Sequence, residues 1–172
     1  MIGGEGKVVE IDESKFGKRK YHWGHYVKGQ WVFGGVQRGT GRTFLVAVHD
    51  RSAETLIGLI KQWILPGTTI ISDCWAAYSS LRDEGYTHFT VNHSITFVDE
   101  ATGNHTNTIE STWKHVKAIL SPYNRKADYV YFLAEYMFRQ QKCKADNVDP
   151  FCKFIEIVAS IDWSNTNSTN SQ

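Results

Sequence analysis

Apolar residues gather in short runs that predict five β-strands. The first run, residues 8–12, is apolar at its start and ends on acidic residues. The second and third runs flank residues 38–42, whose two glycines predict a hairpin turn. Gly34 and Gly35 lie inside the second run and indicate either a bulge or a close approach of the backbone. The predicted strands are 8–12, 30–37, 43–48, 68–72 and 88–91.

Five other stretches carry apolar residues at the spacing of α-helices. Ser52 is a typical N-cap for the first helix, which Pro66 and Gly67 end. Asp149 and Pro150 start the last helix with an acidic cap and a proline in the first turn. The helix before it has an aromatic stripe, which we assign to the core and not to a cofactor site. The predicted helices are 52–64, 76–81, 105–117, 127–142 and 149–161.

The helix at 105–117 places a charged stripe beside an apolar one, whose spacing continues to Leu120. The apolar stripe should face a core and consists of Ile109, Trp113, Val116 and Leu120. The charged stripe lies about 100° round the helix and consists of Glu110, Lys114 and Lys117. Asn107 and Glu110 also have the spacing of a capping box, in which Glu110 folds back onto the helix start. The alternative is that Glu110 points towards a site shared with other acids.

The order of these elements predicts an α/β fold, with a mixed sheet, helices packed on its faces and additional C-terminal helices. Asp12 and Asp73 each end a predicted strand. If these strands are parallel neighbours, both acids lie at the carboxyl ends of the strands, where sites in α/β proteins collect. We expect one domain over residues 1–163 and a disordered polar tail over residues 164–172.

Composition narrows the class of protein. The chain has 172 residues, of which 41% are hydrophobic and 22% charged, as in an ordinary globular domain. The net charge of +1 excludes a uniformly basic nucleic-acid binder, so contacts with DNA must use local patches. The three cysteines form no paired motif, which argues against a disulfide framework or a zinc ribbon. With no apolar run of membrane-spanning length, we expect an intracellular protein that does not bind membranes.

A basic segment follows the first predicted strand. Aromatic residues alternate there with basic ones, which suits contacts with a phosphate backbone and with unstacked bases. A solvated loop is the alternative for the same composition. The candidate DNA-binding residues are Lys15, Lys18, Arg19 and Lys20 in this segment, with Lys114 and Lys117 on the later helix.

Asp12, Asp73 and Glu110 are the candidate catalytic and metal-binding residues. Carboxylates that lie close together repel one another, and a divalent cation relieves this repulsion. Oxygen ligands favour Mg²⁺ or Mn²⁺, and two such ions would suit displacement at phosphorus. Each acid could instead serve as a turn or cap residue, and Glu10 and Glu13 leave the choice of ligand on the first strand open. A Cys74 nucleophile with His93 or His105 as its base is disfavoured because no third group orients the pair.

Six motifs, in order and at specific spacings, closely resemble the Merlin family of cut-and-paste transposases and their bacterial relatives of the XO2-like type. The motifs are VEIDESKFGKRKY, WVFGGVQRG, DRSAETL, LPGTTIISDCWAAY, YTHFTVNHS and HTNTIESTWKHVK. The resemblance implies an RNase H-like catalytic core with a DDE triad. It carries the triad onto Asp12, Asp73 and Glu110, with Lys117 as a basic residue on the same helix. Some relatives have asparagine as the third member of the triad.

The resemblance further implies metal-dependent DNA strand cleavage and strand transfer, with two Mg²⁺ or Mn²⁺ ions as cofactors. The implied partners are transposon ends, target DNA and further copies of the chain assembled on DNA. The expected location is the nucleus in a eukaryote, or the cytoplasm and nucleoid in a bacterium. Full-length relatives have a DNA-binding segment ahead of the core. We therefore expect a catalytic-domain fragment, a truncated copy or a domesticated descendant.

Two other functions share parts of this pattern. One is a domesticated, non-catalytic DNA-binding derivative of a transposase. The other is a nuclease of the RNase H type that acts on RNA–DNA hybrids. Metal binding distinguishes the first from a transposase, and a comparison of hybrid with duplex DNA as substrate distinguishes the second.

Overall fold

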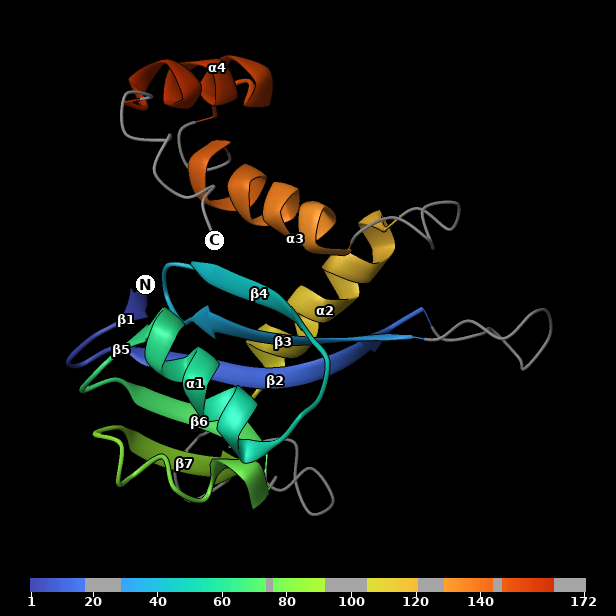
Figure 1. Cartoon of the computed structure of the whole chain (residues 1–172). Coiled ribbons are helices and arrows are strands. Elements are labelled where there is room, and N and C mark those ends of the chain that lie inside the picture. Colours follow the sequence, from blue (N-terminus) through green and yellow to red (C-terminus); the bar gives the residue numbers. More distant parts are fainter. Residues whose placement is uncertain (18–28, 74–75, 92–104, 121–128, 144–146, 163–172) are drawn as a thin grey trace, which may run out of the picture. The chain divides into compact units, whose positions relative to one another are not determined.

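A five-stranded mixed sheet is the larger of the two sheets that the described residues form (Figure 1). The computed structural model describes residues 1–17, 29–73, 76–91, 105–120, 129–143 and 147–162. The strand order is β4-β3-β2-β6-β7, and a separate parallel pair joins β1 and β5. Within the larger sheet β4, β3 and β2 are antiparallel neighbours, while β6 and β7 continue parallel to β2. The strands are β1 (Ile2–Gly3), β2 (Val8–Phe16), β3 (Gln30–Gln37), β4 (Thr43–Val48), β5 (Ile64–Leu65), β6 (Thr69–Asp73) and β7 (Thr87–Val91).

The chain divides into two compact units, Met1–Met137 and Phe138–Gln172. The first unit contains the sheet with helices α1 (Ala53–Trp63) and α2 (Asn107–Ile119) and the 3₁₀ turn η1 (Ala76–Tyr78). It also contains α3 (Tyr129–Phe138) except for its last residue. The second unit contains the π-helical turn η3 (Arg139–Cys143) and helix α4 (Pro150–Ser160). Among the described residues, no helix is both long enough and apolar enough to cross a lipid bilayer.

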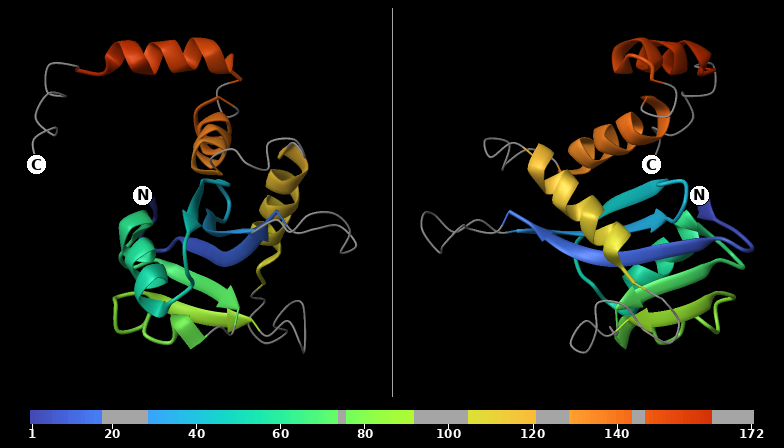
Figure 2. Two further views of the ribbon diagram at one scale, coloured as in Figure 1. Left: turned by 45° about the vertical axis from the view of Figure 1, so that its right-hand side comes forward. Right: turned by 180° about the vertical axis from the view of Figure 1, so that it is seen from behind.

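Helices cover both faces of the sheet, as Figure 2 shows for α1 and α2. Side chains of a strand alternate between the two faces, so successive residues of β2 contribute to different cores. Val9 and Ile11 join the core under α1 with Leu56 and Ile60, all of them fully buried. Phe16 joins the core under α2 and α3, whose other members are Val32, Val36, Leu45, Ile109, Trp113, Val116, Leu133 and Tyr136. The predicted mixed sheet with helices on both faces is therefore confirmed.

The prediction that Asp12 ends the first strand is wrong. β2 continues to Phe16 because β3 pairs with it as far as Gln30, and this pairing depends on a partner distant in the sequence. The parallel pairing with β6 is shorter and ends at Glu10, which lies opposite Ile71. Asp73 ends β6 as predicted. Extension of the same register by two residues places Asp73 opposite Asp12.

Most predicted helices are confirmed, with changes at their ends. Ser52 caps α1 by accepting from the Thr55 amide, and Asp149 caps α4. The predicted helix at 76–81 is wrong beyond its first turn, because η1 is followed by turns. The three-residue period of this turn buries Tyr78 and Leu81 completely. The predicted helix at 127–142 is α3 followed by η3.

Gly34 allows the Trp113 ring to approach the backbone of β3 closely, which is one of the two roles predicted from its position. A Cβ atom at Gly34 would lie 2.7 Å from the Trp113 ring and 2.7 Å from a Leu45 methyl group. The pairing of β3 with β2 and β4 runs through Gly34 without a bulge. Glycine therefore provides the room in which the Trp113 ring packs on the sheet. The proposed tail, 164–172, lies outside the described residues, and the expected boundary at residue 163 stays a prediction.

Candidate active site

Asp12, Asp73 and Glu110 reach the site from three elements: the middle of β2, the end of β6 and the first turn of α2. The even-numbered residues of β2 face α2, since Glu10, Asp12 and Ser14 all contact that helix. Asp73 shares this face because the β2–β6 register, extended two residues beyond Glu10 and Ile71, places it opposite Asp12. The three predicted acids are therefore gathered on the α2 face of the sheet.

The pKa of Asp12 reports this proximity. It is raised from its usual 3.8 to about 6, first by burial and then by the negative charges of Asp73 and Glu110. Trp113 opposes the rise by donating its indole Nε1–H to Asp12 Oδ2 at 2.9 Å. The edge of the Trp113 ring contacts Phe16, with the ring centroids 5.9 Å apart. Asp12 is therefore held in one orientation, next to charges that disfavour its ionised form.

Glu110 lies in the first turn of α2, and the predicted cap at Asn107 is wrong. Asn107 is the first helical residue, and Thr106 occupies the N-cap position without a capping bond from its side chain. The Thr106 hydroxyl instead donates to Glu110 Oε1 at 3.4 Å, which is long for a hydrogen bond. The capping role that the sequence assigned to Asn107 belongs to a residue of β2.

That residue is Glu10, which is fully buried. Its Oε2 atom accepts from the backbone N–H groups of Thr108 at 2.9 Å and Ile109 at 3.0 Å. Its Oε1 atom accepts from the Thr108 hydroxyl and from Arg38 Nε. Glu10 is a possible metal ligand by its position in the sequence, whereas in the structure its oxygens are engaged by α2 and Arg38. Glu10 and Asp12 alternate with apolar residues in the first half of β2, and this was the available signal, but it did not reveal the partner of Glu10.

Glu13 lies on the other face of β2 and has a different environment. Its pKa is raised to about 7 by burial and by the charges of Asp12 and Asp73, while Arg51 lowers it. Oε2 lies 3.8 Å from Arg51 Nη1. Oε1 is buried, and among the described residues no donor bonds to it. Glu13 is therefore an acid next to the site whose ionised form its surroundings disfavour.

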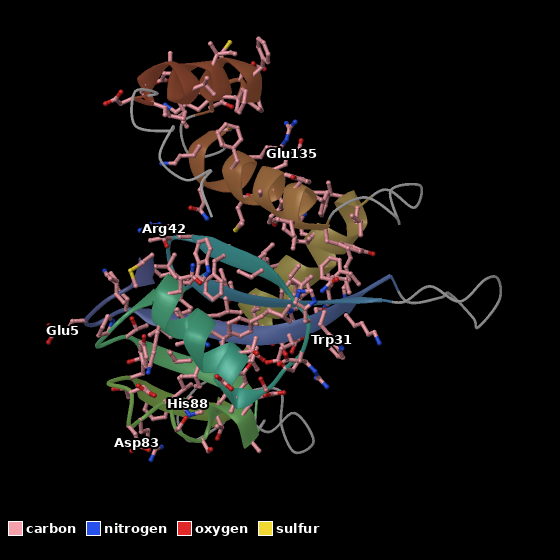
Figure 3. All side chains as sticks on the ribbon, viewed as in Figure 1. Glu5, Trp31, Arg42, Asp83, His88 and Glu135 are labelled. Carbon is pink, nitrogen blue, oxygen red and sulfur yellow. The ribbon has the colours of Figure 1, made fainter. Side chains whose placement is uncertain are left out.

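The predicted DNA-binding residues separate onto two faces of the sheet. Lys117 Nζ donates to Ser14 Oγ at 2.6 Å and lies 5.2 Å from the centre of the Phe16 ring, on the α2 face. Lys114 is exposed on the same helix. Lys15 lies 5.5 Å from the centre of the Trp31 ring on the α1 face, where Trp31 is labelled in Figure 3. Lys18, Arg19 and Lys20 lie outside the described residues.

The chemistry of the three acids suits a divalent cation, because a cation would relieve the repulsion that raises the pKa of Asp12. Among the residues that the structure describes, no three His, Cys, Asp or Glu side chains are grouped closely enough to hold a metal ion as they stand. Of the cysteine and histidine residues considered as a nucleophilic pair, Cys74 and His93 lie outside the described residues. His105 Nδ1 lies 3.5 Å from Glu10 Oε1.

Residues 2–141 match the model of the ISXO2-like transposase domain. The chain belongs to this family. The predicted resemblance to XO2-like transposases is thereby confirmed. An uncharacterised transposase-like protein of Haemophilus influenzae is 28% identical over 83 residues. That match covers 48% of this chain and 66% of the relative, so the chain spans just under two-thirds of the relative's length.

Solved structures of retroviral integrase cores share the fold. The magnesium complex of the HTLV-2 integrase catalytic core, in its dimeric form, aligns with a TM-score of 0.53 and 13% identity over 78% of this chain and 86% of that one. The catalytic core of BIV integrase aligns with a TM-score of 0.53 and 13% identity over 88% of this chain and 95% of that one. A chain of the simian T-cell lymphotropic virus intasome, in complex with the PP2A regulatory subunit B56 gamma, aligns with a TM-score of 0.54 and 16% identity over 78% of this chain and 48% of that one. At these identities the likeness shows the fold alone, and it confirms the predicted RNase H-like architecture.

Proposed function

We propose that this chain is the catalytic domain of a DDE transposase that cleaves DNA strands and transfers them to target DNA in a metal-dependent reaction. The observation that carries the proposal is the convergence of Asp12, Asp73 and Glu110 on one face, where the charges of the other two acids raise the pKa of Asp12. Membership of a transposase family supports the same reaction class.

Asp12, Asp73 and Glu110 would hold Mg²⁺ or Mn²⁺, in the stoichiometry of two ions that phosphoryl transfer favours. When bound, the ions would stabilise the charge that develops on the attacking and leaving oxygens. The HTLV-2 integrase core, which has the same fold, is known in complex with magnesium. Trp113 binds Oδ2 of Asp12 through the indole N–H and so restrains the orientation of the carboxylate.

Lysines on the α2 face would bind the DNA backbone. Lys117 lies on the helix that carries Glu110, and Lys114 is exposed one turn before it. An ammonium group acts as a point charge on phosphate. We place Lys15, Lys18, Arg19 and Lys20 in a second DNA contact, formed by the segment that follows Asp12 on the chain. A chain of the same fold occurs in the simian T-cell lymphotropic virus intasome, and the HTLV-2 integrase core is known in dimeric and trimeric forms. We propose that this chain also assembles as a homo-oligomer on DNA.

The test is a comparison of two Asp→Asn variants. Asp73→Asn removes a proposed metal ligand, whereas Asp83→Asn makes the same chemical change at an exposed turn before β7 (Figure 3). Calorimetric titration with Mn²⁺ and nicking of supercoiled plasmid are measured for both variants and for the wild type. We expect the wild type and Asp83→Asn to bind Mn²⁺ and to nick DNA, and Asp73→Asn to lose both properties. Equal behaviour of the two variants would refute the assignment.

The second candidate is a non-catalytic DNA-binding derivative. Its supporting observation is that the described residues contain no ready-made group of three metal ligands. It predicts DNA binding that is insensitive to Mn²⁺ and no nicking by the wild type. The same titration and plasmid assay therefore decide between the two functions.

A further inference from the structure

Glu10 has contacts that the proposed chemistry does not explain. Its carboxylate is completely buried, and burial of an unpaired charge would be strongly unfavourable. Four donors compensate for the burial: the Thr108 amide, the Ile109 amide, the Thr108 hydroxyl and Arg38 Nε. Arg38 also donates to the backbone carbonyl of His105, just before the helix. Both oxygens of Glu10 therefore bond to the first turn of α2, and Arg38 links Oε1 to the residue just before Thr106.

The start of a helix needs such a partner, because the first backbone N–H groups have no acceptor within the helix. Thr106 at the N-cap supplies none from its side chain. A carboxylate at this end also interacts favourably with the helix dipole. Here the carboxylate belongs to a strand 98 residues earlier in the chain, so the bond fixes the helix to the sheet as well as capping it.

Two further bonds on the same face complete a ladder between β2 and α2. Asp12 accepts from Trp113, and Ser14 accepts from Lys117. The three strand residues are spaced by two positions, about 6.6 Å along a strand. Their helix partners are spaced by four or five positions, about 6–7.5 Å along a helix. The matching spacings fix both the rotation and the translation of α2 against β2.

We propose that Glu10 is a positioning residue, which locks the first turn of α2 so that the Glu110 carboxylate is held beside Asp12 and Asp73. The inference rests on the proposed function, because the position of Glu110 matters only if it is a metal ligand. Glu110 lies two residues after Thr108 and one after Ile109, whose amides Glu10 binds. A shift of this turn would move Glu110 away from the other acids, while the rest of the helix stayed packed through Trp113 and Val116.

A carboxylate suits this role better than an amide. Glu10 receives only donors, two at each oxygen. In Glu10→Gln one of these oxygens becomes an NH₂ group, which cannot accept and would face two donors. The substitution therefore disturbs the first turn of α2 with almost no change in volume.

The experiment is a double-mutant cycle on the Mn²⁺ dissociation constant, with wild type, Glu10→Gln, Glu110→Gln and the double variant. We expect Glu10→Gln to weaken Mn²⁺ binding about tenfold, as the loss of an outer-shell partner does at other metal sites. In the Glu110→Gln background the same substitution should change the affinity less than about twofold, because the ligand that it positions is already lost. Hydrogen exchange at the Thr108 and Ile109 amides should become faster in Glu10→Gln.

Two variants separate positioning from loss of stability. Ser52→Ala removes the N-cap of α1 and so weakens a helix without touching the site, and it should leave Mn²⁺ affinity unchanged. Thr108→Val removes the hydroxyl that donates to Glu10. It takes the place of Glu10→Gln in the cycle if the Glu10→Gln protein does not fold. If the wild type binds Mn²⁺ and the effects of the substitutions at positions 10 and 110 on its affinity are additive, the positioning role of Glu10 is refuted while the metal site stands. A wild type that binds no Mn²⁺ would overturn the metal site and this role with it.

Discussion

Trp113→Phe tests whether the indole N–H sets the protonation of Asp12. The substitution keeps an aromatic ring against Phe16 but removes the donor that lies 2.9 Å from Asp12 Oδ2. A hydrogen bond to a charged group contributes about 1.5–3 kcal/mol, and about 1.4 kcal/mol corresponds to one pKa unit. The pKa of Asp12, about 6 in the wild type, should therefore rise by about 1–2 units. At pH 7 much of Asp12 would then be protonated in the metal-free protein.

The assay is a pH titration of the Asp12 carboxyl carbon by NMR in the metal-free protein. Trp63→Phe is the matched control, because Trp63 stacks on Phe44 under the other face of the sheet. We expect the pKa of Asp12 to rise in Trp113→Phe and to stay near its wild-type value in Trp63→Phe. Mn²⁺ affinity should fall most at low pH in Trp113→Phe, since protons compete with the metal for the carboxylate. An unchanged or lowered pKa of Asp12 in Trp113→Phe would refute the reasoning.

Three other predictions concern the packing, the charge and the DNA contact of the site. Gly34→Ala should lower the free energy of unfolding by about 1–3 kcal/mol in urea titrations, because a Cβ atom would collide with Trp113 and Leu45. The control Gly58→Ala, where a Cβ atom on α1 would meet open space, should not lower the free energy of unfolding. The metal-free protein should be about 2–3 kcal/mol more stable at pH 5.5 than at pH 8. Folding raises the pKa values of Asp12 and Glu13 to about 6 and about 7, so the folded state takes up protons as the pH falls through 7 and 6 while the unfolded state does not. Equal or greater stability at pH 8 in urea titrations with a chelator would contradict this sign. Lys117→Gln should weaken the binding of duplex DNA and reduce the slope of log K against log salt concentration by about 1, measured by fluorescence anisotropy. Lys15→Gln, on the opposite face of the sheet, should weaken binding less, because we assign the duplex contact to the α2 face. A larger loss of affinity in Lys15→Gln would contradict that assignment.

Local sequence signals predicted the parts of the site that depend on local structure. Asp73 follows a short apolar run, and that run is β6. Glu110 lies in a helix whose apolar stripe could be read from its spacing, and Ile109, Trp113 and Val116 are buried as predicted. The RNase H-like fold followed from the order of the elements together with the resemblance. These features needed no knowledge of which strands are neighbours.

The errors come from contacts between distant parts of the chain. Asp12 lies within β2 because β3 extends the pairing beyond it, and no residue near Asp12 signals this extension. Asn107 was predicted as the cap because the sequence shows only nearby capping groups. The helix is instead capped by Glu10, 98 residues away from Thr108. A buried acid whose partners lie on another element cannot be distinguished by sequence pattern from an acid that binds metal.

The most direct test of the site is the anomalous scattering of Mn²⁺ in crystals of the wild-type protein. We expect manganese between the carboxylates of Asp12, Asp73 and Glu110, on the α2 face of the sheet, with Glu10 still bound to the first turn of α2. Manganese bound elsewhere, or no manganese at millimolar concentrations, would contradict the assignment of these three acids.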